Sequence, residues 1–357
     1  MIYVIHTFFD NVRSKVLQLS VNKYKLGFFS HSVYHCKKTM LPDISLYATR
    51  IVLTSFTIFG TIGNILNILI FTRPKLLQLS CTIYLFAASI ANILAIYTNL
   101  LTRLLAGGFA NDITKLSDFL CKFRYYVGYI CLAVSPYFLI LACFDRYCSS
   151  SISTSKRAWC NKKTAIKLCI GAILLACLLY LHMAIFFEIK YTNNTSSCYS
   201  RLGAYDLFYR IFYLVIYCLL PSVCMGVLCV LTLKNIRQQV QRIHPALRNG
   251  NQSLRRIDQQ MIRMLLGQIL TQVICILPFA ILSLIALFIS SSTVVFNFLL
   301  QMSILPLYVS YTTSFYIFTL SSRIYRQELK KIICFWKPNN NDSEHNMNTI
   351  NTVTNLR

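Results

Sequence analysis

Charged residues are scarce in this chain of 357 residues. Asp, Glu, Lys and Arg make up 13% of it and hydrophobic residues 56%, whereas an ordinary soluble protein is about 25% charged. This composition excludes a disordered chain, a coiled coil and a nucleic-acid-binding module. Acidic residues are scarcest, with 11 against 35 basic ones and a net charge of +24. In so apolar a chain, such an excess usually lies beside anionic lipid on the cytosolic face.

Long apolar runs are seldom interrupted by charge. About 20 apolar residues cross the hydrocarbon core of a membrane as a helix. Windows of that length without Asp, Glu, Lys or Arg cover residues 51–72, 76–102, 125–144, 168–187, 211–233 and 264–322. The last window suffices for two helices with a break near Ser290, so the sequence predicts an all-α membrane protein built as a seven-transmembrane helix bundle. A β-barrel is excluded because the windows lack the in-out alternation of barrel strands.

The basic residues predict the orientation. They concentrate in segments 73–80, 149–163, 234–263 and 323–357, and Lys and Arg are in excess on the cytosolic side of membrane proteins. We therefore expect a multi-pass plasma-membrane protein with residues 1–49 as an extracellular tail and 50–322 as the membrane domain. The basic residues of 1–38 oppose this orientation, and a native start at Met40 would remove them.

A charged motif ends the third window. Asp145, Arg146 and Tyr147 follow its apolar run, and taken alone they could be interfacial charge that merely ends a helix. Cys121 precedes Arg146 by about 37 Å of helix, which places it at the opposite membrane face. The other cysteine of the predicted outer loops is Cys198. An oxidising exterior would join Cys121 to Cys198.

These features occur together, in order, in the rhodopsin-like (class A) G-protein-coupled receptors, which residues 50–336 resemble. The resemblance rests on Gly63-Asn64 in the first span, on Cys121 and Asp145-Arg146-Tyr147 in the third, on Pro221 in the fifth and on Cys275-Ile276-Leu277-Pro278 in the sixth.

The resemblance implies a receptor that passes an extracellular binding event to a heterotrimeric G protein. Arg146 would be restrained at rest by Asp145 and by Asp258 at the base of the sixth helix. Asp258 could instead be a solvated aspartate among neighbouring arginines. The resemblance assigns helix packing and switching to Asn64, Asn92, Ser135, Pro221, Pro278, Ser314 and Phe318.

Several positions depart from the family pattern. Ile276 stands where the sixth helix usually has tryptophan, and Pro136 where the third usually has an aliphatic residue. Asn92 takes the place of the sodium-binding aspartate, which predicts weak sodium binding because a buried cation needs a compensating charge. Ser314 and Phe318 replace the outer residues of the Asn-Pro-x-x-Tyr motif, where Pro306 would supply the kink instead.

Two residues that are missing from their family positions restrict the class of ligand. Gly128 stands where amine receptors carry an aspartate, and Tyr308 where opsins carry the retinal-binding lysine. The sequence therefore disfavours an amine ligand and light sensing, and no cofactor is expected. The mixed charges expected at the outer face suit a peptide, and the FMRFamide-type invertebrate neuropeptide receptors are the nearest subgroup. These charges are Arg103, Lys115, Lys122, Arg124, Glu188, Lys190, Arg201 and Asp206.

The remaining motifs predict modification and lipid contact. Asn193 and Asn194 begin overlapping glycosylation sequons in an outer loop. Residues 323–336 predict an amphipathic helix at the lipid interface. Its apolar side would consist of Ile324, Tyr325, Leu329, Ile332, Ile333 and Trp336. Cys334 at its end is a palmitoylation candidate or a free interfacial cysteine. Residues 337–357 predict a disordered cytosolic tail, whose Ser and Thr residues could recruit a receptor kinase and arrestin.

Three alternatives stay open from the sequence. A transporter or channel would need ionisable residues near the midplane, and the charge-free windows offer none. A membrane enzyme would need clustered nucleophiles, acids or metal ligands, yet His182 stands alone in the fourth window. The altered motifs also fit a receptor-like protein without G-protein output, such as a decoy or a chemosensory protein.

Overall fold

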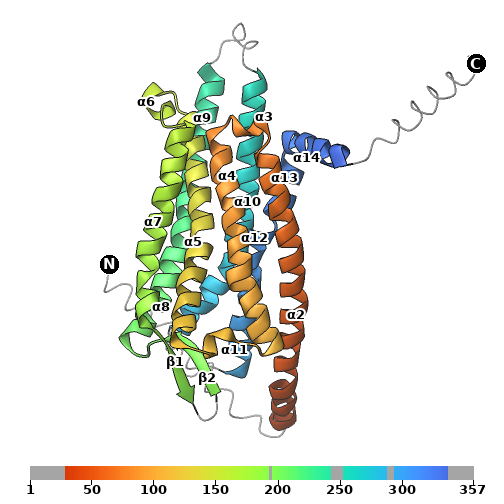
Figure 1. Cartoon of the computed structure of the whole chain (residues 1–357), viewed down its shortest axis with the longest axis vertical. Coiled ribbons are helices and arrows are strands. Elements are labelled where there is room, and N and C mark those ends of the chain that lie inside the picture. The colour runs from red at the N-terminus through yellow and green to blue at the C-terminus, as the bar shows by residue number, and fades with distance from the viewer. Residues whose placement is uncertain (1–28, 193–194, 243–251, 288–292, 337–357) are drawn as a thin grey trace, which may run out of the picture.

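The computed structural model describes the backbone of residues 29–192, 195–242, 252–287 and 293–336, and the side chains of residues 43–191, 196–238, 259–287 and 293–333. Within these ranges the chain forms an elongated bundle of nearly parallel helices (Figure 1). The predicted seven-helix fold is confirmed, because seven helices are long and apolar enough to cross a membrane. They are Asp43–Phe71, Ser80–Gly108, Asp118–Ser149, Lys162–Phe186, Ala204–Gln238, Gln259–Ala286 and Val294–Thr312.

Several spans combine more than one helical element. The α-helices and strands are α2 (Phe29–Phe71), α3 (Pro74–Leu77), α4 (Ser80–Ala95), α5 (Asp118–Ser149), α6 (Thr154–Arg157), α7 (Lys162–Phe186), β1 (Phe187–Thr192), β2 (Thr195–Ser200), α8 (Ala204–Phe212), α9 (Leu220–Arg242), α10 (Gln252–Ala286), α11 (Val294–Ser303), α12 (Val309–Thr312), α13 (Ser314–Ser321) and α14 (Arg323–Trp336). Wider π-helical turns cover Ile96–Leu101, Leu104–Gly108 and Tyr213–Leu219, and 3₁₀ turns cover Ile113–Lys115 and Leu305–Tyr308.

The third span is the centre of the bundle. In the most apolar stretch of α5, 67% of the residues are buried inside the protein, against 22% in α7. The exposed side of α7 carries apolar residues such as Leu174 and Leu178, as expected of a surface that faces lipid. Residues of α5 therefore contact most of the other spans, and this helix contributes residues to both ends of the molecule.

Prolines account for two of the changes in helix geometry. Pro306 lies in the 3₁₀ turn that separates α11 from α12, which confirms the expected break in the seventh span. Pro221 follows the π-helical turns of the fifth span. Proline has no N–H to donate, so the helical hydrogen-bond pattern must change around it.

A two-stranded antiparallel hairpin, which was not predicted from the sequence, joins α7 to α8. β1 and β2 pair from Phe187 opposite Ser200 to Thr192 opposite Thr195. The predicted disulfide is present and links Cys121 at the start of α5 to Cys198 in β2. The Ile189 N–H donates to Asp118 Oδ1 over 3.1 Å, which adds a second contact between the hairpin and α5.

The amphipathic helix spans the predicted residues, 323–336, and runs across the direction of the bundle (Figure 1). Ile324, Tyr325 and Ile332 are buried against the other helices. Ile333, which we expected on the same apolar side, is 58% exposed. The inward side instead holds Glu328, which pairs with Lys331 over 2.8 Å.

The proposed native start stays a prediction. α2 begins at Phe29 and passes through position 40 without a break, while the membrane-crossing stretch begins at Asp43.

We predict that Cys121→Ala and Cys198→Ala each lower the free energy of unfolding by about 2–4 kcal/mol, because the disulfide closes a long loop. Thermal unfolding of the purified protein in detergent would measure the effect. Cys224→Ala is the control, since this half-exposed cysteine is free. The double variant should lose no more than either single variant; additive losses would contradict a shared bond.

Candidate functional site

Asp145 and Arg146 form a buried ion pair at the end of α5. Arg146 Nη2 lies 2.6 Å from Asp145 Oδ2, and the two side chains are only 4% and 3% exposed. Asp145 Oδ1 accepts a hydrogen bond from Ser80 Oγ over 2.5 Å. Removing one partner of such a pair strands the other charge, at a cost of about 3–5 kcal/mol. Ser80 was missed by the sequence interpretation because only the fold brings the start of α4 to this position.

Tyr147, the third residue of the motif, has its described hydrogen-bond partners outside this pair. Its hydroxyl accepts a hydrogen bond from Lys156 Nζ over 2.8 Å, and its carbonyl accepts one from Asn235 Nδ2 of α9 over 3.3 Å. The Cys160 thiol donates to the Asp145 carbonyl over 3.3 Å. Burial and the Asp145 charge raise the pKa of Cys160 to about 12, so this thiol stays protonated at neutral pH.

The second acid predicted to restrain Arg146 stays a prediction. Asp258 belongs to α10, but its side chain lies outside the described residues. Two residues further along, Gln260 is buried and accepts hydrogen bonds at Oε1 from Ser322 Oγ (3.1 Å) and the Ile324 N–H (2.8 Å). α10 is thus attached to the junction of α13 and α14, a contact that sequence spacing did not predict.

Four of the predicted packing residues lie in one buried polar network. Ser135 Oγ donates to Asn92 Oδ1 over 2.5 Å, and Asn92 Nδ2 donates to Asn64 Oδ1 over 3.1 Å. Ser314 Oγ donates to the same Asn64 oxygen over 3.3 Å. The network joins α5, α4, α2 and α13 with neutral groups, so the replacement of the family's aspartate by Asn92 leaves these hydrogen bonds intact.

The network extends to α14 through two residues that the sequence interpretation missed. Asn67 Nδ2 donates to Ser314 Oγ over 3.0 Å, and the Tyr325 hydroxyl donates to Asn67 Oδ1. Phe318, at the position of the motif tyrosine, packs edge-on against Tyr325 with ring centroids 6.0 Å apart. The hydroxyl that Phe318 lacks is therefore supplied to this region by its ring partner in α14.

A third set of contacts begins at Pro136, inside α5. Proline cannot donate to the carbonyl four residues earlier, which leaves the Leu132 carbonyl free. The Tyr311 hydroxyl of α12 donates to that carbonyl over 2.9 Å and bonds to the Tyr217 hydroxyl over 2.7 Å. The Tyr311 carbonyl accepts from Asn64 Nδ2 over 2.9 Å. Pro136 was noted as a departure from the family pattern, but these partners follow only from the fold.

The opposite end of the bundle holds a cavity of about 330 Å³ beneath the hairpin end of α5. Five tyrosines, three arginines and one aspartate dominate its wall. The lining comprises Asn99, Arg103, Arg124, Tyr125, Tyr129, Leu132, Asp206, Tyr209, Arg210, Tyr213, Phe279, Ser283, Ala286, Leu300, Ile304 and Tyr308. This volume lies within the range of small-ligand pockets.

The structure explains why the amine-binding position holds glycine. A Cβ atom at Gly128 would lie 2.7 Å from Asn99 Oδ1, and Asn99 Nδ2 donates to the Gly128 carbonyl over 2.8 Å. Asn99 therefore fills the space that an acidic side chain would need. Tyr308, at the retinal-lysine position, is one of the residues that line the cavity.

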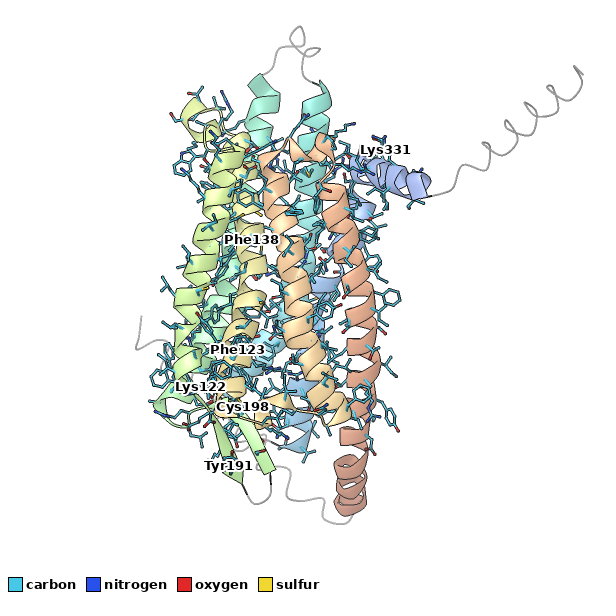
Figure 2. All side chains as sticks on the ribbon, viewed as in Figure 1. Lys122, Phe123, Phe138, Tyr191, Cys198 and Lys331 are labelled. Atoms are coloured by element: carbon cyan, nitrogen blue, oxygen red, sulfur yellow. A yellow bond between two sulfur atoms is a disulfide. The ribbon has the colours of Figure 1, made fainter. Side chains whose placement is uncertain are left out.

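The cavity and the Asp145–Arg146 pair belong to opposite ends of the molecule. Lys122 and Cys198 lie at one end and Lys331 at the other, with Phe138 between them (Figure 2). Pro221 and Pro278 lie within α9 and α10, and neither lines the cavity. Asn193, Asn194 and the side chain of Cys334 lie outside the described residues, so glycosylation and palmitoylation stay predictions.

His182, the solitary histidine of the fourth span, is hydrogen-bonded as expected of a packing residue. Its Nδ1 lies 2.7 Å from the Tyr205 hydroxyl. Among the residues that the structure describes, no group of three or more His, Cys, Asp or Glu side chains could hold a metal ion.

We predict that Tyr311→Phe destabilises the protein by about 1–3 kcal/mol, because it leaves the Leu132 carbonyl and the Tyr217 hydroxyl without this partner in a water-free interior. Thermal unfolding in detergent checks this. Tyr97→Phe removes a hydroxyl from a half-exposed ring with no hydrogen bond in the described structure and should change little. Equal effects of the two substitutions would show that the Tyr311 hydroxyl contributes nothing specific.

Comparison with known proteins agrees with this arrangement. The family profile described as "7 transmembrane receptor (rhodopsin family)" matches residues 63–343. No curated protein matches the chain at a significant level. The family match covers most of the chain, including the polar network, the disulfide and the Asp145–Arg146 pair. The chain therefore belongs to the rhodopsin family of seven-transmembrane receptors.

Proposed function

We propose that this protein binds an extracellular ligand in the tyrosine-lined cavity and activates a heterotrimeric G protein at its Asp145–Arg146 end. The observation that carries the proposal is that both sites belong to one central helix. Arg124, Tyr125 and Tyr129 line the cavity from the first half of α5. The Asp145–Arg146 ion pair lies in the last turns of the same helix.

The contacts between the two sites support transmission. Tyr213 lines the cavity and stacks on Tyr217 with ring centroids 4.7 Å apart. Tyr217 bonds to Tyr311, and Tyr311 accepts from Asn64. The polar network leads on from Asn64 to α14. A ligand that displaces Tyr213 would therefore disturb packing near the cytosolic ends of the helices.

The orientation follows from charge. Most basic loop residues belong to the end that carries Asp145, and the positive-inside rule places that end in the cytosol. The disulfide between Cys121 and Cys198 at the other end suits an oxidising exterior. We therefore propose a plasma-membrane receptor with its N-terminus outside.

A peptide is the ligand class that we propose. The cavity wall carries three arginines and one aspartate among its tyrosines, so charged groups are available to a bound ligand. Aromatic walls and charged groups together suit the side chains and termini of a short peptide. Assignment to the FMRFamide type, and recruitment of a receptor kinase and arrestin, stay predictions from the sequence.

The test is G-protein activation in cells that express the receptor, screened with a neuropeptide library. Arg146→Ala should abolish a ligand response, because Arg146 is the residue by which the resemblance implies G-protein contact. Arg323→Ala, at an exposed position of α14, should keep at least half of it at equal surface expression.

Specific results would exclude the proposal. A ligand response that survives Arg146→Ala unchanged would exclude the assigned coupling site. Ligand binding without G-protein activation would favour the non-signalling alternative. The altered residues Ile276, Ser314 and Phe318 are the reason for considering that alternative. Ion flux without ligand would favour a channel.

A further inference from the structure

Positively charged side chains outnumber negatively charged ones in the cavity wall, and only some of them form ion pairs. Arg103, Arg124 and Arg210 line it together with one carboxylate, Asp206. Each guanidinium carries a full positive charge at any physiological pH. The charge of the cavity therefore depends on which of these groups neutralise one another.

Asp206 is fully engaged. Its Oδ2 accepts a hydrogen bond from Arg210 Nε over 2.8 Å, and its Oδ1 accepts one from Ser200 Oγ over 2.6 Å. Asp206 and Arg210 are one turn apart in α8 and form an i,i+4 ion pair. This pair is neutral as a whole, and both carboxylate oxygens already accept a hydrogen bond within the protein.

Arg103 and Arg124 have no acidic partner among the described side chains. Arg124 donates to Thr102 Oγ1 from Nε (3.3 Å) and Nη2 (3.1 Å), and its guanidinium lies 4.7 Å from the centre of the Tyr125 ring. Arg103 lines the same cavity as Arg124. Neither a hydroxyl nor an aromatic ring neutralises a charge.

The other described acids of this end, Asp43, Asp112, Asp118 and Glu188, do not line the cavity. Asp43 lines a separate pocket. Asp112 caps the turn at Thr114, Asp118 accepts from the hairpin, and Glu188 pairs with Arg201. The described cavity therefore carries two uncompensated positive charges. Arginine side chains hold carboxylates through two parallel hydrogen bonds, which makes an oxyanion the best complement to them.

The other lining residues indicate which group of the ligand would lie next to its oxyanion. Tyr213 and Tyr308 line the cavity, and within the described structure neither hydroxyl has a hydrogen-bond partner, so both can donate to a ligand. Phe279 packs edge-on against Tyr213 with centroids 5.5 Å apart. Such a surface suits an aromatic side chain, because ring pairs favour offset and edge-on contacts.

We propose that the ligand presents a carboxylate to Arg103 and Arg124, next to an aromatic side chain that packs among the cavity tyrosines. The proposal rests on the proposed function only in placing the ligand in this cavity. It narrows the peptide class to acidic peptides or peptides with a free C-terminal carboxylate. A basic, amidated peptide would meet two uncompensated arginines, so this inference disfavours the FMRFamide type.

The experiment is a thermal-shift titration of the purified full-length protein in a non-ionic detergent. Two probes differ only in charge: N-acetyl-Phe-Phe with a free carboxylate and its C-terminal amide. The acid should bind at least about tenfold more tightly than the amide, because a charged hydrogen bond to arginine is lost in the amide. Inorganic phosphate at the same ionic strength tests whether a bare oxyanion suffices.

Matched variants locate the effect. Arg103→Gln and Arg124→Gln should each reduce the preference for the acid by about tenfold. Arg201→Gln removes an arginine of the same end that does not line the cavity and should leave the preference unchanged. Should a cavity variant fail to fold, the comparison of acid with amide on the unaltered protein still tests the proposal.

The following results of the binding experiment would overturn the proposal. Equal binding of acid and amide, or no stabilisation by the acid, would exclude a carboxylate site. Stabilisation by phosphate as strong as that by the acid would exclude the aromatic contribution. Loss of acid preference in Arg201→Gln would place the site on the hairpin. Because the readout is binding, a protein that prefers the acid but activates no G protein would keep this inference and remove the proposed coupling.

Discussion

The interior of a membrane protein offers no water to a polar group, so each carbonyl or amide there needs a partner within the bundle. Pro136 illustrates this constraint, because proline has no N–H to donate to the Leu132 carbonyl four residues earlier. Tyr311 satisfies that carbonyl, and the same residue bonds to Tyr217 and Asn64. The carbonyl freed in the central helix is thereby linked through Tyr311 to the first, fifth and seventh spans.

The same constraint accounts for the polar network beyond Asn64. The neutral amide of Asn92 takes the place that the family fills with a charged aspartate, and Phe318 takes that of the motif tyrosine. The polar groups around them remain hydrogen-bonded through Ser314 and Asn67 to Tyr325. A neutral network loses less free energy on burial than a charged one. The altered motif residues have therefore not left the bundle without internal contacts; they have changed which groups make them.

Charge is handled differently at the two ends of α5. Arg146 is almost fully buried and lies against Asp145, whose other oxygen is held by Ser80, so this charge is compensated within the protein. Arg103 and Arg124 line a cavity at the other end of the molecule, and the described partners of Arg124 are a hydroxyl and an aromatic ring. In low-dielectric surroundings an uncompensated charge is costly unless water or a ligand reaches it. An arginine pair left without an acid is thus better understood as a binding feature than as a stabilising one.

Much of the fold follows from the sequence alone. The charge-free windows determined seven spans, because membrane thickness and backbone hydrogen bonding are local requirements that each segment meets by itself. The spacing of Cys121 and Arg146 along one helix likewise placed the disulfide and the ion pair at opposite ends. Only the tertiary structure decided that Tyr325 meets Asn67 and that Tyr311 donates to the carbonyl freed by Pro136. Both contacts join residues far apart in the chain, and they depend on how rigid helices rotate and pack against one another, which no local pattern of residues encodes.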